Sequence, residues 1–208
     1  MSDIRIVARD YAILKEVFRW RITTGKHICQ LAGFTGQRAC DRRLAKLITA
    51  GFLTRSKILY GFPSLYSITP RGRKLIGVPN KKEQVRIEQI PHDLAVLDTA
   101  MYFHNQKGIA YSAITTEKQL HRLDGFSNRK HRPDFIFAQG DKTYCVEVEL
   151  TLKAKRRFEN NVKENFEHYD GQFWVVPDAQ SKIFRLLKEM SDQYPDIEIL
   201  EREVIQPF

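Results

Sequence analysis

Two strand-like segments separated by one long polar helix limit the possible folds of this chain more than any other feature of its sequence. Residues 143–151 (TYCVEVELT) and 172–176 (QFWVV) are typical of strands, and residues 154–169 are typical of a helix. A helical crossover between two strands of one sheet makes those strands parallel. We therefore expect the second half of the chain to contain a sheet with a parallel pair, covered by helices.

The rest of the second half extends this α/β pattern. Apolar residues at helical spacing predict a helix over 89–106, and β-type runs follow at 109–114 and 133–138. A helix containing residues 183–190 and a strand near 196–200 complete the series. The predicted order is helix, three strands, helix, strand, helix, strand.

The strand predicted over 143–151 carries two carboxylates on one face. Alternate residues of a strand share a face, so Glu147 and Glu149 lie on the side opposite the apolar residues Val146 and Val148. Two adjacent acids repel each other and need a cation, a metal ion or water. Asp134 begins the neighbouring strand, and three converging carboxylates suit Mg²⁺ or Mn²⁺, which can activate water against a phosphodiester.

The first half of the chain has a different pattern, in which helices precede a hairpin. The predicted elements are a helix over 9–21, a short helix capped by Thr23 or Thr24, a helix over 35–51 capped by Thr35, a hairpin formed by 52–60 and 64–68, and a helix opened by Pro70. Over roughly residues 9–77 this order resembles the winged helix-turn-helix family. The resemblance implies a DNA-binding domain whose third helix reads the duplex.

Basic and polar residues on the third helix, the hairpin and the helix after it are the candidate DNA contacts. On the third helix they lie away from the apolar stripe, where Gln and Arg can reach base edges in the major groove and the helix N-terminus can meet phosphate. The cations further along the chain would contact the DNA backbone. The candidates are Thr35, Gln37, Arg38, Arg42, Arg43, Lys46, Arg55, Lys57, Arg71 and Arg73.

The positive charge of the chain lies entirely in this first part. Residues 1–80 contain 15 Lys or Arg against 4 Asp or Glu, a net charge of +11, whereas residues 81–208 contain 19 against 21, a net charge of −2. This asymmetry favours double-stranded DNA as the partner of the first part. The alternative is a solvated basic face on a winged helix that binds protein.

Composition at the junction and cysteine usage indicate how the chain is organised. A Gly, Pro, Asn and Lys cluster at 77–84 predicts a linker, so we expect domains at 1–77 and 89–208 joined by 78–88. Three scattered cysteines without metal-ligand spacing predict reduced thiols. The sequence has no signal-like start and no apolar run of membrane-spanning length, and we therefore expect a cytoplasmic protein without a membrane partner.

The acidic residues of the second half resemble the motif of the PD-(D/E)xK nuclease-like superfamily. Pro133-Asp134 matches its first element, Glu147-Val148-Glu149 matches its second, and the predicted element order matches its core. The resemblance implies Asp134, Glu147 and Glu149 as catalytic residues, with Asp134 and Glu147 as metal ligands. Glu149 stands where the family has lysine. Lys153 or Lys155 can reach back to supply that charge if the domain is active, but otherwise the cation that assists the attacking water is missing.

A second resemblance covers nearly the whole chain. The winged helix followed by HDLAVLDTAMYF, TEKQL, RPDFIF, VEVELTLKAKRR and FWVV resembles the replication-relaxation family of plasmids and integrating elements. It adds His92 and Glu117 as candidate site residues. His92 can equally be a helix-start residue, and Glu117 an acid in the first turn of a helix, where the dipole favours it.

Together these patterns predict a two-domain α+β chain, an N-terminal winged helix-turn-helix followed by an α/β nuclease-like domain. The expected function is sequence-specific DNA binding for a mobile element, in plasmid replication, mobilisation or transcriptional control, by a homodimer. The nuclease-like domain is expected to be non-catalytic and to require no cofactor. One alternative is a Mg²⁺- or Mn²⁺-dependent endonuclease targeted by the winged helix. Another is an assembly factor that docks a relaxase or replication protein.

Overall fold

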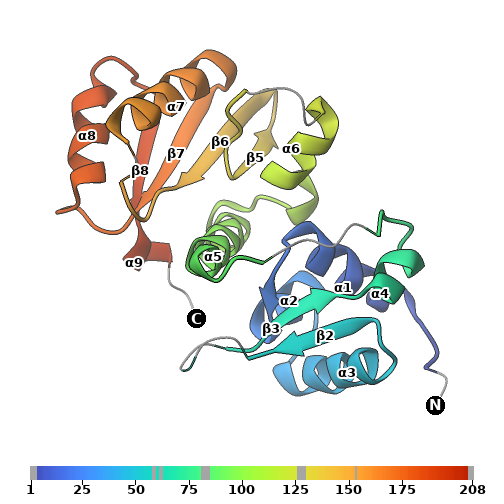
Figure 1. The fold of residues 1–208 in the computed structure, drawn as a ribbon. Coiled ribbons are helices and arrows are strands. Elements are labelled where there is room, and N and C mark those ends of the chain that lie inside the picture. Colours follow the sequence, from blue (N-terminus) through green and yellow to red (C-terminus); the bar gives the residue numbers. More distant parts are fainter. Residues whose placement is uncertain are drawn as a thin grey trace. The chain divides into compact units, whose positions relative to one another are not determined.

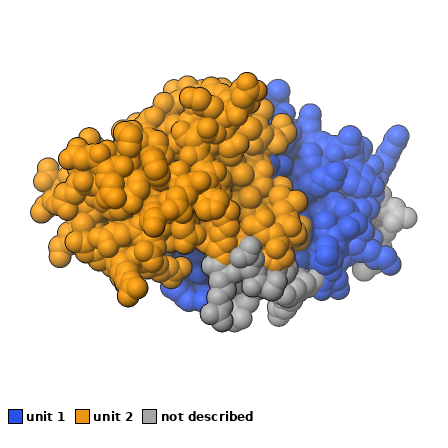
Figure 2. Space-filling view, turned by 90° about the horizontal axis from the view of Figure 1, so that it is seen from above, with its two compact units in different colours: residues 1–97 blue, residues 98–208 orange. Residues whose placement is uncertain are grey.

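The chain is mixed α+β and divides into two compact units, Met1–Leu97 and Asp98–Phe208 (Figure 2). The computed structural model describes residues 4–57, 60, 63–80, 85–125, 130–152 and 154–205. Within these residues the first unit contains a three-stranded sheet and the second a five-stranded sheet. Each unit has its own hydrophobic core.

The first unit consists of helices followed by a small sheet (Figure 1). Its elements are α1 (Ala8–Arg19), β1 (Thr23–Thr24), α2 (Gly25–Leu31), α3 (Gln37–Thr49), β2 (Leu53–Ser56), β3 (Leu65–Ile68), α4 (Pro70–Leu75), η1 (Ile87–Gln89) and the start of α5 (Ile90–Lys107). The sheet is antiparallel in the order β1-β3-β2. The predicted hairpin is confirmed as β2 and β3, although residues 58–59 and 61–62 of its connection lie outside the described residues.

Apolar residues at helical spacing build the core of the first unit. Ile13, Leu14 and Val17 of α1 pack with Leu44 and Leu47 of α3, and all five are buried. Because these positions recur every three or four residues, each helix turns one stripe inward and leaves the opposite side to solvent. The amphipathic pattern predicted for both helices is confirmed.

Helix starts in the first unit agree with the sequence except at α3. The Thr24 hydroxyl accepts from His27 N at the start of α2, and the Thr69 hydroxyl accepts from Gly72 N at the start of α4, which Pro70 opens. The predicted Thr35 cap of α3 is wrong, since Gly36 is the N-cap and no side chain caps this helix. Gly36 has an extended backbone that any residue can adopt, and because it has no side chain, it offers no oxygen to accept the first N–H groups of α3.

The boundary between the units lies inside α5, later than the predicted start of the second domain at residue 89. Ile90 and Leu94, in the first two turns of α5, are buried with Ile22 and Leu65 of the first unit, and Val85 packs against this group. The sequence predicted a linker over 78–88, but Val85 and the first turns of α5 belong to the core of the first unit. Because these apolar side chains of α5 are buried in the first unit, the boundary between the two units lies between Leu97 and Asp98.

The second unit is built around the five-stranded sheet (Figure 1). Its elements after α5 are η2 (Tyr111–Ala113), β4 (Ile114–Thr116), α6 (Glu117–Asp124), β5 (Phe135–Gln139), β6 (Lys142–Val148), α7 (Lys155–His168), β7 (Gly171–Val176), α8 (Lys182–Ser191), β8 (Ile197–Glu201) and α9 (Arg202–Ile205). The strand order is β4-β5-β6-β7-β8. Neighbouring strands are antiparallel from β4 to β6 and parallel from β6 to β8, which confirms the predicted parallel crossover through α7.

Helices cover both faces of this sheet. Phe103 of α5 makes ring contacts with Phe135, Phe137 and Phe173 on one face. On the other face, residues of α7 and α8 pack against β7, where Trp174 is completely buried. The alternation of Phe173 and Trp174 between the two faces follows the two-residue period of a strand.

Three details of the second unit differ from the sequence prediction. The run 109–114, predicted as a strand, contains the 3₁₀ turn η2, and β4 begins only at Ile114. Helix α6 is absent from the predicted series of elements. Strand β6 also ends at Val148, so Glu149 lies just beyond the strand in which the sequence placed it.

Candidate functional site

Helix α3 presents a polar face opposite its buried stripe. Cys40, Leu44 and Leu47 are buried, whereas the predicted contact residues on the other side are exposed. The exposed side chains are those of Thr35, just before the helix, and of Gln37, Arg38, Asp41, Arg42 and Lys46. Its three cations, Arg38, Arg42 and Lys46, are exposed to solvent, so this face can contact a polyanion.

The hairpin and the helix after it add exposed cations. Arg55 on β2 and Lys57 just beyond it are exposed, and the Lys57 ammonium lies 5.9 Å from the ring of Tyr60, which is 99% exposed. Arg71 of α4 is exposed as well, with its guanidinium carbon 4.7 Å from the centre of the Phe52 ring. These side chains extend the positive charge of the unit beyond α3.

Two of the predicted DNA contacts are occupied by contacts within the first unit, Arg43 partly exposed and Arg73 buried. Arg43 donates through Nε to Asp10 Oδ1 at 2.6 Å and through Nη2 to Asp10 Oδ2, and Asp10 is completely buried. The hydrogen bond to Asp10 raises the pKa of Arg43, although burial works in the opposite direction. Arg73 is only 7% exposed, with its guanidinium 5.2 Å from the Phe18 ring. Neither side chain belongs to the exposed basic surface.

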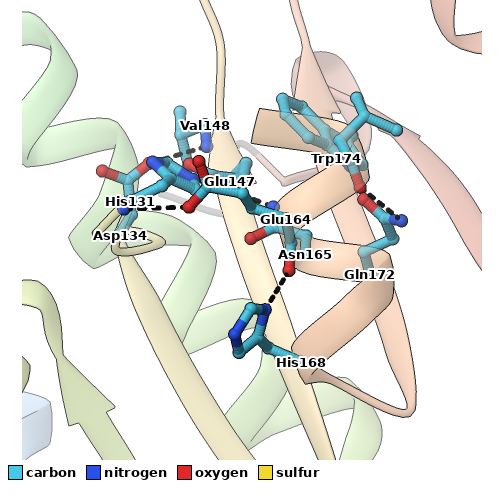
Figure 3. Close-up of polar contacts among 10 residues, drawn as sticks. His131, Asp134, Glu147, Val148, Glu164, Asn165, His168, Gln172 and Trp174 are labelled. Atoms are coloured by element: carbon cyan, nitrogen blue, oxygen red, sulfur yellow. Dashed lines mark hydrogen bonds and ion pairs between the residues drawn. The ribbon is translucent and has the colours of Figure 1, made fainter. Parts of the chain in front are cut away.

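In the second unit, Glu147 lies at the centre of a buried polar cluster (Figure 3). It is 8% exposed, and its Oε1 accepts from His131 Nε2 at 2.5 Å and from Asn165 Nδ2 of α7 at 3.1 Å. The backbone N–H of His131 donates to Glu164 Oε2 at 3.1 Å. The segment before β5 is thereby attached to both β6 and α7.

Asp134 and Glu149 have backbone partners of their own. Asp134 Oδ2 accepts from Val148 N at 2.8 Å (Figure 3), and the Asp134 carbonyl accepts from Glu117 N at 2.8 Å. Glu149 is 5% exposed, and its N–H donates to Val175 O at 2.9 Å, which continues the pairing of β6 with β7. Asp134 therefore joins the end of β6 to the start of α6.

Burial and hydrogen bonding shift the titration of this cluster. Burial raises the pKa of Glu147, and the hydrogen bond from His131 only partly offsets this effect. Burial alone would lower the pKa of His131, but its hydrogen bond to Glu147 and the nearby charges of Glu147, Glu164 and Asp134 outweigh it, so the pKa of His131 is raised. Both shifts favour the protonated form, so the contact between His131 and Glu147 keeps a proton at this pair up to a higher pH than ordinary His and Glu side chains would.

This arrangement does not present three open carboxylates to one ion. Glu147 Oε1 accepts two side-chain N–H groups and Asp134 Oδ2 accepts a backbone N–H, so one oxygen of each residue predicted as a metal ligand already has a donor. Over the described ranges, no group of three or more His, Cys, Asp and Glu side chains is placed to hold a metal ion. Lys153 lies outside the described residues. The donors present fit a proton-sharing cluster better than a Mg²⁺ or Mn²⁺ site.

The two further candidates lie in different units. Glu117 is the first residue of α6, next to Asp134 through its backbone, and its Oε1 is 3.5 Å from His121 Nε2. His92 lies in the first turn of α5, 3.5 Å from Asp93 Oδ1, in the part of α5 that belongs to the first unit. The structure thus places Glu117, and not His92, in the same unit as the acids.

His131 and Asn165 are site residues that the sequence prediction missed. Asn165 follows Phe158 and Val162 on the buried stripe of α7, and a polar residue at such a position needs a hydrogen-bond partner. That spacing is a usable signal. His131 carried no comparable signal, because it precedes β5 and its partner Glu147 lies on β6, 16 residues further along the chain.

Comparison of the sequence with known proteins identifies no family for this chain. The sequence matches none of the family models, and a search of curated proteins found no match. None of the helices in the described part of the chain is both long enough and apolar enough to cross a membrane.

Proposed function

We propose that the first unit is a winged helix-turn-helix domain that binds double-stranded DNA, with α3 as the helix that enters the major groove and β2–β3 as the wing. The observation that carries this proposal is the exposed face of α3, where Gln37, Arg38, Arg42 and Lys46 lie opposite a buried stripe. Long polar side chains at the start of such a helix can reach base edges.

Charge supports the same assignment. The first 80 residues carry a net charge of +11, and Arg55, Lys57 and Arg71 lie exposed on or near the hairpin. Cations at these places would neutralise phosphates on either side of the groove. Arg43 and Arg73 are not part of the proposed interface, because Arg43 is hydrogen-bonded to Asp10 and Arg73 packs over the Phe18 ring.

We propose that the second unit is a nuclease-like domain that does not cut DNA. Support comes from the order α5, β4, α6, β5, β6, α7, β7, which matches the predicted order apart from α6, and from Asp134 just before β5 and Glu147 on neighbouring β6. The carboxylates accept N–H groups from Val148, His131 and Asn165, and an acid stands at the lysine position of the motif. The cation that would stabilise a growing negative charge on phosphate is therefore missing from the motif position itself.

On these grounds we infer a cytoplasmic, sequence-specific DNA-binding protein similar to the replication-relaxation family, acting as a homodimer in plasmid replication, mobilisation or transcriptional control. The dimer is tested by light scattering at micromolar concentration, with and without duplex DNA. A monomer mass under both conditions excludes it.

The DNA-binding proposal is tested by the salt dependence of binding. Full-length protein is titrated into a fluorescent mixed-sequence duplex at several salt concentrations, and affinity is expected to fall steeply with salt. Arg55→Ala combined with Lys57→Ala is expected to make the plot of log affinity against log salt less steep by about 2, since each phosphate contact contributes about 0.9. Absence of binding, or an unchanged slope in the double variant, counts against the assignment.

A further inference from the structure

Gln37 and Asp41 form a pair on the exposed face of α3. Gln37 is the first residue of the helix and Asp41 follows one turn later, with Gln37 Nε2 donating to Asp41 Oδ1 at 2.8 Å. A carboxylate accepts hydrogen bonds and does not donate them, so this contact fixes which side of the Gln37 amide carries the nitrogen. Both side chains are exposed, so a ligand can contact the Gln37 amide in this orientation.

The backbone of Gly25, at the start of α2, lies directly beside this pair. A Cβ atom on Gly25 would lie 3.2 Å from Gln37 Nε2, 3.6 Å from Asp41 Oδ1 and 3.7 Å from Tyr66 Cε2. A side chain at residue 25 would therefore press on the Gln37 amide. The amide is held by Asp41 on its own helix and by the close approach of α2.

An amide held in this way retains one N–H group and its carbonyl oxygen for a ligand. In the major groove adenine offers an acceptor, N7, beside a donor, N6–H, whereas guanine offers two acceptors, cytosine a donor and thymine an acceptor. The donor and acceptor of glutamine match adenine. Fixing the side chain before binding also lowers the entropy lost on contact.

We infer that Gln37 reads one adenine in the major groove and that Asp41 is a positioning residue for this contact. The inference rests on the proposed DNA-binding function and goes beyond it, because it names the base and the residue that orients its reader. Arg38 and Arg42 flank the pair along the same face and supply the attraction to phosphate that a neutral amide lacks.

The test begins with full-length protein and a library of duplexes containing a randomised stretch, from which bound sequences are selected. The native chain is expected to select an A·T pair at one fixed position. Replacing that adenine by 7-deazaadenine, which lacks the N7 acceptor, is expected to lower affinity by about 5- to 100-fold. Gln37→Ala is expected to bind both duplexes equally.

Variants at residues 41 and 25 separate positioning from general stability. Asp41→Ala and Gly25→Ala are expected to reduce the ratio of affinities for the adenine and 7-deazaadenine duplexes at least threefold. Asp41→Asn, which keeps an acceptor oxygen, is expected to retain most of that ratio. The control Glu88→Ala removes an exposed acid elsewhere in the first unit and is expected to leave the ratio unchanged.

The results separate the inference from the function beneath it. Salt-sensitive binding without any base preference, or a preference that Gln37→Ala retains, overturns the adenine assignment and leaves DNA binding standing. An unchanged ratio in Asp41→Ala overturns the positioning role alone. Absence of duplex binding by the native chain overturns both the proposed function and the inference.

Discussion

Arg42 and Arg43 are adjacent in α3, yet their surroundings are opposite. Arg42 is exposed, whereas Arg43 forms two hydrogen bonds with Asp10, a carboxylate that is completely buried. A buried charge that loses its partner is strongly unfavourable. The same residue type is thus exposed at one position and paired with a buried acid at the next.

Arg43→Ala is therefore expected to lower the free energy of unfolding by about 3 kcal/mol, because Asp10 would remain buried without its guanidinium. Arg42→Ala is the matched control and is expected to change it by less than about 0.5 kcal/mol. Urea unfolding monitored by circular dichroism measures both. Equal effects of the two substitutions would contradict the ion pair as a structural contact.

The His131–Glu147 pair predicts a pH dependence of stability. A group whose folded pKa is raised stabilises the fold fully below its unfolded pKa and loses that contribution as pH rises through the folded pKa. The pKa of His131 is raised from its ordinary value of 6.5. The advantage of the native chain over His131→Ala is therefore expected to decline as pH rises above 6.5.

Urea unfolding at a series of pH values, followed by the fluorescence of buried Trp174 in a Trp20→Phe background, measures this difference. A control substitution at exposed His168, which contacts the Glu164 carbonyl, is expected to show no such trend. A stability difference between the native and His131→Ala chains that is constant or grows with pH would exclude the proton-sharing pair.

At the scale of elements, the start of α5 belongs to the first unit, although the sequence predicted that the first domain ends at residue 77. Ile90 and Leu94 are buried against Ile22 and Leu65. A fragment of residues 1–80 lacks both α5 side chains, whereas a fragment of residues 1–107 keeps them. The shorter fragment is expected to be less stable by about 3 kcal/mol or more, since full burial of each such side chain contributes about 1.5–3 kcal/mol.

Thermal and urea unfolding of the two fragments tests this expectation. The variant 1–107 with Ile90→Ala and Leu94→Ala should approach the stability of 1–80, while Glu88→Ala in the same fragment should not. If 1–80 unfolds at the same denaturant concentration as 1–107, the first unit ends where the sequence predicted.

The elements that the sequence predicted are those whose signals are local. Helix α3 has a regular apolar stripe, and the strand, helix, strand series of β6, α7 and β7 combines clear periodicity with a handedness rule. The predicted series of elements left out α6, because its sequence, EKQLHRLD, has two apolar residues and no clear stripe. The alternative interpretation of Glu117 as an acid in the first turn of a helix is confirmed. Its start does have a signal, since Thr116 N donates to Gln119 Oε1 in a capping box.

The site was predictable in part, for the same reason. Alternation along β6 correctly placed Glu147 among buried residues of one strand face, and the position of Asp134 beside β6 followed from the adjacent strand. The partners of the acids were not predictable, because His131 and Asn165 meet Glu147 only through tertiary structure. Likewise, only the fold shows that Arg43 and Arg73 face inward.

For the whole molecule, we propose that the first unit binds DNA and that the second unit does not cleave it. We expect no robust cleavage of plasmid or linear duplex with Mg²⁺, and at most slow nicking with Mn²⁺, because the carboxylates already have N–H partners and an acid replaces the assisting lysine. Gel assays with supercoiled plasmid measure this, and Asp134→Ala with Glu147→Ala is the comparison. Several turnovers per hour by the native chain alone would replace this account with the endonuclease alternative.

The central claim is that the exposed face of α3 binds DNA. The most direct measurement compares full-length native protein with Arg38→Ala plus Arg42→Ala on a duplex selected from the randomised library. We expect the double variant to lose about 1–3 kcal/mol of binding free energy for each side chain that reads a base. We also expect it to discriminate less between selected and unrelated duplexes. Lys163→Ala plus Lys188→Ala removes equal charge from the second unit and should bind like the native chain. Undiminished affinity and specificity in the α3 variant would contradict the claim.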